Sequence, residues 1–240
     1  MNFRDLVKFL QTEMNKQGEN LKVDGDPGPK TQAALAKFDV GIVVTKQPAD
    51  DTLAPAPVAE GDYFGAPWIG VDLDLLGRDE SDKELNARYV PEWAKVGLPG
   101  YKSLMGNARA WCAIRVSKAL RQVGINVKGL TAAASSMSKF GKKCPFWFGA
   151  GLDIKHRAGG RHVCFFLYWI DEAKKIAATL DGNRGNKFCV ARTDLSGSGD
   201  TLVTGPRWPN DAPDGMKVSM EDVLTKYPFL KVGSVGAGTR

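Results

Sequence analysis

The sequence predicts an α+β protein in which helices come first and an antiparallel sheet follows. Apolar residues recur at helical spacing in residues 2–17 and again after Cys112. Residues 159–170 form an aromatic and β-branched run entered by two glycines, which is typical of a strand, and two shorter runs of the same kind follow at 175–180 and 187–192. Helices followed by a strand meander are the order expected of an α+β domain.

Composition is that of an ordinary globular protein, with 43% hydrophobic and 25% charged residues and a formal net charge of +6. The first residues lack the apolar core of a signal peptide, and the longest apolar run, 163–170, is far shorter than the ~20 residues of a membrane span. We therefore expect a soluble chain made in the cytoplasm, without stable membrane insertion. The basic residues are scattered and match no nucleic-acid-binding motif, so no nucleic-acid partner is expected.

The cysteines are few and dispersed, and no CxxC pair occurs. This spacing favours reduced thiols over a disulfide framework or a zinc ribbon, and we predict neither a metal nor a cofactor. Two of these residues lie in predicted strands and are interpreted as structural, and a third is interpreted as a surface thiol: Cys164, Cys189 and Cys144 respectively.

The N-terminal helix, residues 2–17, ends at Gly18 and is followed by a Gly-rich turn and an Ala-rich second helix that starts after Pro29. The turn reads Val-Asp-Gly-x-x-Gly-Pro-x-Thr over residues 23–31. This arrangement resembles the small three-helix type of peptidoglycan-binding domain, here assigned to residues 1–45. The resemblance implies that glycan or stem peptide binds beside the turn, at Asp24, Gly25, Gly28 and Thr31.

Residues 46–63 contain three prolines and four acidic residues, a composition typical of an extended, semi-stiff linker. A second domain is predicted over residues 64–240. Its expected helices run from Pro67 to near Gly77, over Lys83–Trp93, from Cys112 onward, over Ser135–Phe140 and over Ser219–Lys226. Trp68 and Trp93 are expected in its core.

Cys112 is placed in the first turn of a helix whose buried face carries Ala113, Val116, Leu120 and Val123. Unpaired N–H groups at a helix start favour an anion, so a thiol there tends to ionise. A thiolate nucleophile also needs an imidazole and a group that orients it. His162 is the predicted base because it starts a strand, whereas His156, between two basic residues, is predicted to be a solvated loop residue.

The strand beginning at His162 should turn at 171–174 and return along 175–180, which brings Asp181 and Asn183 back to the same sheet end. Alternation places His162 and Cys164 on one face of that strand. The segment 181–186 is predicted to be a turn before the strand at 187–192.

These residues carry a second resemblance. Trp111-Cys112-Ala113 at a helix start, Gly160-Arg-His162-Val163 at a strand start and Leu180-Asp-Gly-Asn183 resemble the CHAP and NlpC-type cysteine peptidase superfamily, which has a papain-like fold, with helices packed on an antiparallel sheet. The resemblance implies that Cys112 is the nucleophile, His162 the base and either Asp181 or Asn183 the orienting group. Asn107 is implied as an oxyanion donor. Arg161 and the segment 144–153 depart from the family pattern.

Together the two resemblances imply a phage endolysin, a monomer that cuts an amide bond in peptidoglycan. It would stay in the host cytoplasm until a holin releases it to the periplasm and cell wall. Whether it is an amidase or a stem-peptide endopeptidase stays open. The alternatives are a zinc amidase with His156, His162 and Asp153 or a cysteine as ligands, and a non-catalytic wall-binding protein. A glycosidase would need a carboxylate pair such as Glu80 and Asp82, which nothing in the sequence marks out.

Overall fold

The computed structural model describes residues 3–16, 18–24, 62–98, 100–105, 111–157, 159–198 and 200–232. The chain divides into two compact units, Met1–Ala54 and Pro55–Arg240, and the division lies inside the segment predicted as a linker. The predicted second helix of the first unit lies outside the described residues.

The first unit contains helix α1, Phe3–Lys16, close to the predicted 2–17. The chain after it folds back along the helix through two side-chain clamps. Asn15 accepts from the backbone N–H of Leu21 at 2.7 Å and donates to the carbonyl of Leu21 at 2.8 Å. The side-chain amide of Gln11 donates to Oδ1 of Asp24 and accepts from the backbone N–H of Asp24, both at 3.2 Å. Leu21 and Met14 are both buried in this unit.

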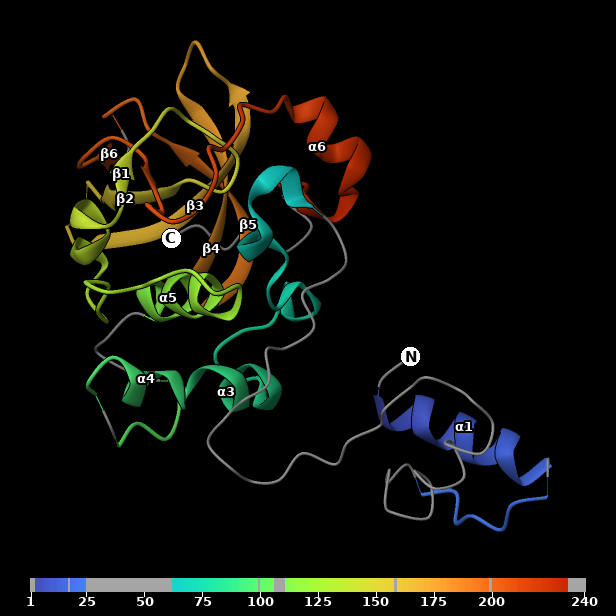
Figure 1. Ribbon diagram of the computed structural model, residues 1–240. Helices are drawn as coiled ribbons and strands as arrows, with labels where there is room; N and C mark the ends of the chain where they lie inside the picture. Colours follow the sequence, from blue (N-terminus) through green and yellow to red (C-terminus); the bar gives the residue numbers. More distant parts are fainter. Residues whose placement is uncertain are drawn as a thin grey trace. The chain divides into compact units, whose positions relative to one another are not determined.

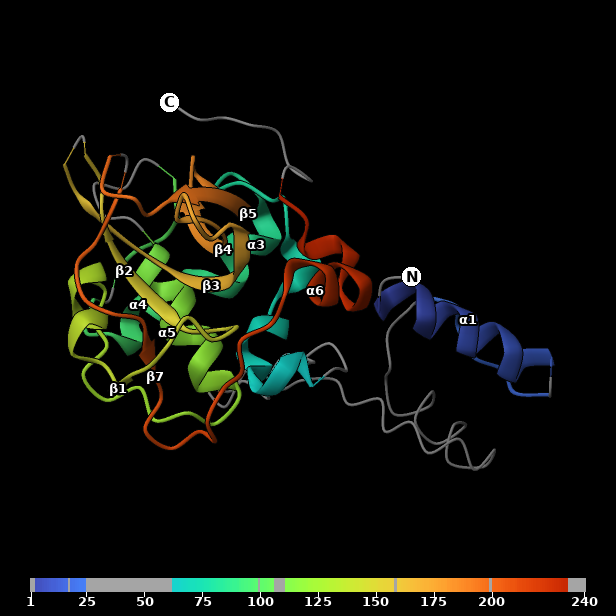
Figure 2. The same cartoon turned by 90° about the horizontal axis from the view of Figure 1, so that it is seen from above.

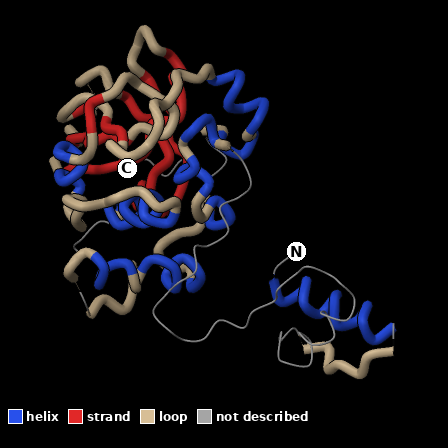
Figure 3. Tube along the Cα trace, in the orientation of Figure 1, coloured by secondary structure: helices blue, strands red, loops and turns tan. Residues whose placement is uncertain are grey.

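An antiparallel sheet is the centre of the second unit, as the sequence predicts. Its described strands run in the order β1-β7-β2-β3-β4-β5, with β6 also paired to β2. Figure 3 shows them gathered in one layer. Their bounds are β1 Lys142–Lys143, β2 Gly151–Lys155, β3 Arg161–Asp171, β4 Ile176–Arg184, β5 Lys187–Asp194, β6 Thr201–Leu202 and β7 Arg207–Trp208.

The strand prediction was right for β3, β4 and β5 and missed β2. β2 passes beside β3 with Ile154 opposite His162, and four of its five residues are buried. A strand buried on both faces loses the polar–apolar alternation by which strands are recognised. A register shift between Phe166 and Tyr168 also breaks the predicted alternation in the second half of β3.

The helix predicted from Pro67 to Gly77 is wrong as a single element. The chain makes two 3₁₀ turns, η2 Pro67–Gly70 and η3 Leu73–Leu75, after the 3₁₀ turn η1 Tyr63–Gly65. Between them Asp72 has a left-handed backbone with φ of 59°, which stops helical propagation. The predicted helix at 135–140 is likewise a 3₁₀ helix, η4 Ala134–Lys139.

The helix predicted over Lys83–Trp93 is two helices, α3 Lys83–Tyr89 and α4 Glu92–Lys95. Pro91 lies between them and has no N–H to continue the hydrogen-bond ladder. The C-terminal helix is confirmed as α6, Met220–Lys226, with Ser219 capping it by accepting from the N–H of Asp222 at 3.1 Å; η5, Pro228–Leu230, follows it.

Helix α5, Cys112–Gln122, is the most buried helix of the second unit, since every residue from Cys112 to Leu120 is buried. It lies between the β3–β4 part of the sheet and α4 (Figures 1 and 2). Burial on all sides explains why the predicted apolar face describes only part of it: Arg115 and Lys118 are enclosed as well. The guanidinium of Arg115 lies over the rings of Phe165 and Phe188, 5.2 and 4.6 Å from their centres.

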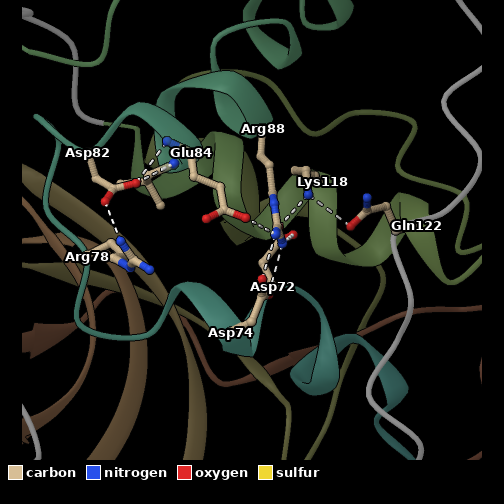
Figure 4. A network of polar contacts seen from close by, with 9 residues as sticks. Asp72, Asp74, Arg78, Asp82, Glu84, Arg88, Lys118 and Gln122 are labelled. Carbon is tan, nitrogen blue, oxygen red and sulfur yellow. Dashed lines mark hydrogen bonds and ion pairs between the residues drawn. The ribbon is translucent and has the colours of Figure 1, made fainter. Parts of the chain in front are cut away.

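An ion network fixes the far side of α5, as Figure 4 shows. Asp72, fully buried, accepts from Lys118 of α5 and, at 3.1 Å, from Arg88 of α3. Burial raises the pKa of Asp72, but the charges and hydrogen bonds of Lys118 and the neighbouring residues outweigh it and hold this pKa below its usual value. Removing Lys118 would leave the buried carboxylate of Asp72 with one cationic partner fewer, so the network holds α5 in place.

The two ends of the described second unit meet. Tyr63 stacks on Tyr227 with ring centres 4.6 Å apart, and the N–H of Tyr63 donates to the Tyr227 hydroxyl at 3.0 Å. Asp62 pairs with Lys226 beside them. No helix in the described ranges is long and apolar enough to cross a membrane.

Candidate active site

Cys112 is the first residue of α5, and its side chain is buried against the sheet. Trp111, the residue before it, packs on Tyr89 with ring centres 5.5 Å apart and anchors the start of the helix. Gly182 of β4 makes this close approach possible. A Cβ at that position would lie 2.7 Å from the Cβ of Arg115 and 3.0 Å from the Trp111 ring.

His162, near the start of β3, lies beside this thiol. Its Nε2 is 2.6 Å from Oδ1 of Asp181 on β4, and both side chains are buried. The Cys112 thiol is close enough to this ring for the two groups to shift each other's pKa values. Since Nε2 is bound to the carboxylate, Nδ1 is the ring nitrogen left to serve the sulfur. The structure therefore brings three of the predicted site residues together and joins two of them, His162 and Asp181, by a hydrogen bond.

The segment 181–183 is not the turn that the sequence predicts. β4 continues through Arg184, and the hairpin turns at residues 185–186. The register shifts between Asp181 and Arg184, with Asn183 in a left-handed conformation at φ of 66°. Asp181 is thus held in the ladder opposite Cys164, while the Oδ1 of Asn183 is buried without a hydrogen-bond partner in the described part. Of the two predicted orienting groups, Asp181 is the one bonded to His162.

The pKa shifts favour a thiolate–imidazolium pair. Burial raises the pKa of Cys112, but the hydrogen bond and charge of His162 and the backbone N–H groups of Val163 and Ala113 lower it more, leaving it below its usual value. Burial lowers the pKa of His162, yet hydrogen bonds to Asp181 and Cys112 raise it to about 10. Both shifts stabilise the charged forms, a negative sulfur beside a positive ring, over the neutral thiol and imidazole.

His156 lies in the predicted loop, after β2, but it is only partly exposed and is held by an acidic partner rather than by solvent alone. Its Nδ1 is 2.8 Å from Oδ1 of Asp200, and its ring centre lies 5.7 Å from that of His162. Arg184 lies between the two carboxylates, 3.7 Å from Asp181 and 3.8 Å from Asp200. Residue spacing carries no signal for this cluster, because Asp200 is 44 residues from His156.

Arg161, which precedes His162 on β3, has a structural role beside the site. Its guanidinium forms a bidentate pair with Asp153 of β2, whose carboxylate is fully buried. This pair ties β2 to the start of β3 and so supports the backbone that carries His162. It also removes Asp153 from the zinc ligand set considered above.

A different set of ligand types does converge. Among the described residues, one group of His, Cys and acidic side chains lies close enough to share a metal ion: His162, Cys164 and Asp181, whose ligand atoms are all within 4.8 Å of one another. All three are buried. Cys189, the register partner of Asp181 on β5, lies on the other side of the same carboxylate.

Several predicted site residues lie outside the described residues: Asn107 of the oxyanion site, and Gly25, Gly28 and Thr31 of the wall-binding turn. Asp24 is described and is held by Gln11. Cys144 is half-buried rather than a surface thiol, and burial raises its pKa to about 11. No family model, curated protein or solved structure matches the chain.

Proposed function

We propose that this protein is a peptidoglycan hydrolase of the endolysin type that cuts an amide bond with Cys112 as nucleophile. The observation that carries the proposal is the grouping of the Cys112 thiol at the start of α5 with His162, whose Nε2 lies 2.6 Å from Oδ1 of Asp181. A nucleophile, a base and a group that orients the base are the three parts of thiol-based amide hydrolysis.

The first half of the reaction forms a thioester. The Cys112 thiolate attacks the carbonyl carbon, and the oxyanion that develops accepts from the backbone N–H of Cys112 at the start of α5, with Asn107 as the proposed second donor. His162, already protonated, gives its proton to the departing amine as the C–N bond breaks. Asp181 keeps the ring oriented and stabilises its positive charge during this step.

The second half hydrolyses the thioester. His162, now neutral, takes a proton from water, and the resulting hydroxide adds to the thioester carbonyl. The C–S bond breaks, the carboxylate product leaves, and the sulfur returns as thiolate beside the imidazolium. The cycle consumes one water and needs no redox partner or metal ion.

The wider architecture supports the same reaction class. A cysteine at a helix start, a histidine on the next long strand and a carboxylate on the strand after that are the order found in papain-like CHAP and NlpC-type domains, and we assign the second unit to this fold. We assign the first unit to a three-helix peptidoglycan-binding module, with its site at Asp24, Gly25, Gly28 and Thr31. The wall polymer is then the substrate, the chain acts as a monomer, and a holin releases it from the host cytoplasm to the wall.

Purified peptidoglycan tests the proposal. The wild-type protein should lower the turbidity of a peptidoglycan suspension, and Cys112→Ala should reduce the rate by about 10⁴-fold or more. Cys144→Ala, at a thiol remote from the triad, is the matched control and should hydrolyse at the wild-type rate. Mass spectrometry of the released fragments identifies the bond. An amidase frees the carboxyl group of muramic acid together with the N-terminus of the first stem-peptide residue, whereas an endopeptidase frees an N-terminus within the peptide and leaves the muramic acid amide intact.

The same assay decides between the proposal and its two rivals. A zinc amidase would lose activity with a chelator and keep it after thiol alkylation. The buried position of the convergent ligands disfavours it, because a catalytic zinc needs an open coordination position for water. A non-catalytic wall-binding protein would sediment with peptidoglycan and release no fragments.

A further inference from the structure

We propose that the second unit holds a buried inhibitory site for a soft divalent cation of the Zn²⁺ or Cd²⁺ class, formed by His162, Cys164 and Asp181. The ligand atoms of these residues lie within 4.8 Å of one another on the adjacent strands β3 and β4. The inhibition rests on the proposed function, whereas the binding of the metal does not.

The sheet pre-arranges the three ligands. His162 and Cys164 are two residues apart on β3, so their side chains leave the same face, and Cys164 is the direct register partner of Asp181. Each is at most 4% exposed. Rigid placement of this kind means that a metal ion does not have to order its own ligands on binding.

The donor set selects the class of metal. One imidazole nitrogen, one sulfur and a carboxylate suit Zn²⁺ and Cd²⁺, whereas Ca²⁺ and Mg²⁺ prefer oxygen ligands alone. The second oxygen of Asp181 supports the same class of metal ion. Oδ2 is buried and has no hydrogen-bond partner in the described part of the chain, so it is available to make the carboxylate bidentate and complete a four-atom shell.

Binding follows a simple proton balance. The Cys164 thiol loses its proton to become a thiolate ligand, and Nε2 of His162 loses the proton that it shares with Asp181. Two protons leave for each metal ion bound, and Nδ1 keeps its proton toward Cys112. The metal ion thus replaces the His162–Asp181 hydrogen bond, and the ring can no longer move toward a leaving group or accept a proton from water.

Metal binding should therefore stop hydrolysis while Cys112 itself binds no metal ion. This distinguishes the proposed site from a simpler one, in which a metal ion bridges Cys112 and His162. The two sites share His162 and differ in which cysteine supplies the sulfur.

Titration with CdCl₂ distinguishes them, because a cadmium–thiolate bond has a characteristic ultraviolet absorption. The full chain, fully reduced and free of oxygen, should bind one Cd²⁺ with this absorption. Cys112→Ala should retain it, and Cys164→Ser should weaken binding by more than the ~100-fold that loss of an outer-shell contact can cost. Cys189→Ser is the matched control, because Cys189 also faces Asp181 but lies outside the ligand group, and it should bind like the wild type.

Two results would overturn the proposal. The first is loss of the absorption in Cys112→Ala with retention in Cys164→Ser. The second is absence of stoichiometric binding in Cys112→Ala when circular dichroism shows it folded. A binding titration uses no cell-wall substrate, so it stands even if the chain does not hydrolyse peptidoglycan; in that case Zn²⁺ binds and there is no activity to inhibit.

Discussion

Helix α5 carries two buried sets of charges that differ in one respect. At its start, Cys112 belongs to the set that includes His162 and Asp181; two turns later, Lys118 belongs to the set that includes Asp72 and Arg88. In the second set every buried charged atom has a partner. In the first, Oδ2 of Asp181 and Nη1 of nearby Arg184 are buried without a hydrogen bond to any described residue, and so are the three guanidinium nitrogens of Arg115, which lies between the two sets on α5.

This difference separates a structural set of charges from a reactive one. Buried polar groups are normally hydrogen-bonded, since an unmade bond costs about 1–3 kcal/mol. The Lys118 set meets that rule and holds the helix. The Cys112 set breaks it, and unsatisfied atoms of this kind gather where a protein binds or transforms something. Because the Lys118 set holds the helix in place, the end that carries Cys112 can keep buried polar atoms without hydrogen bonds.

The largest effect should come from Asp181→Asn, which keeps the size of the side chain and removes its charge. Hydrolysis should fall by about 10⁴-fold, because the ring of His162 loses the group that orients and stabilises it. The turbidity assay measures the rate. Asn183→Ala is the matched control on the same strand, and an equal loss in that variant would show that Asn183 orients the histidine instead.

The same substitution should move the pH dependence. In the wild type, hydrolysis should fall as pH rises through the His162 pKa of about 10, because the imidazolium is lost. This pKa lies above the unfolded value of 6.5, so the stability that it contributes is full below pH 6.5 and is lost as pH rises through about 10. In Asp181→Asn the pKa of Cys112 should rise with the weaker ion pair. Iodoacetamide labelling should then begin at higher pH than in the wild type.

Lys118→Met tests the structural set. It leaves the carboxylate of Asp72 buried with one partner fewer, and the free energy of unfolding should fall by about 3–5 kcal/mol. Urea denaturation measures this value. Lys95→Met is the control, because Lys95 is 39% exposed and Arg121 still pairs with its partner Glu92, so the loss should stay below ~1 kcal/mol. Equal losses in the two variants would contradict the assignment of Asp72 and Lys118 as the anchor.

Gly182→Ala tests the close approach of β4 to the start of α5. The added methyl group would meet Arg115 and Trp111 of the α5 region, so helix and strand must separate. We expect a loss of ~1–3 kcal/mol in stability and of up to ~100-fold in hydrolysis, since a shift of about 1 Å between Cys112 and His162 can cost that much. A variant with wild-type activity would mean that the triad does not depend on this close approach.

The smallest effect should come from Arg184→Gln. Its guanidinium lies 3.7 Å from Asp181 and is 24% exposed, so the charge is worth about 0.2–1 kcal/mol, or at most ~5-fold in rate. The effect should shrink with added salt. A loss as large as that in Asp181→Asn would place Arg184 among the groups that the reaction requires.

The sequence predicts what depends on local periodicity. The starts of α1, α5, α6 and β3 follow from apolar spacing, capping and glycines. The predicted nucleophile and base both lie at such starts, Cys112 at that of a helix and His162 at that of a strand. What it missed depends on distant parts of the chain. The predicted helix is interrupted at Asp72, which has a left-handed backbone and whose side chain pairs with Lys118, 46 residues away. β4 runs on past Asp181 because β5 pairs with it, although Asp-Gly-Asn has the composition of a turn.

The meeting of Asp62 and Tyr63 with Lys226 and Tyr227 has a consequence for engineering. A domain whose first and last described segments are neighbours can be reopened elsewhere and rejoined by a peptide linker. The exposed loop at 196–198 offers such an opening. A circular permutant cut there would keep α5, β3 and β4 uninterrupted, and the same adjacency would allow the domain to be inserted whole into a loop of another protein.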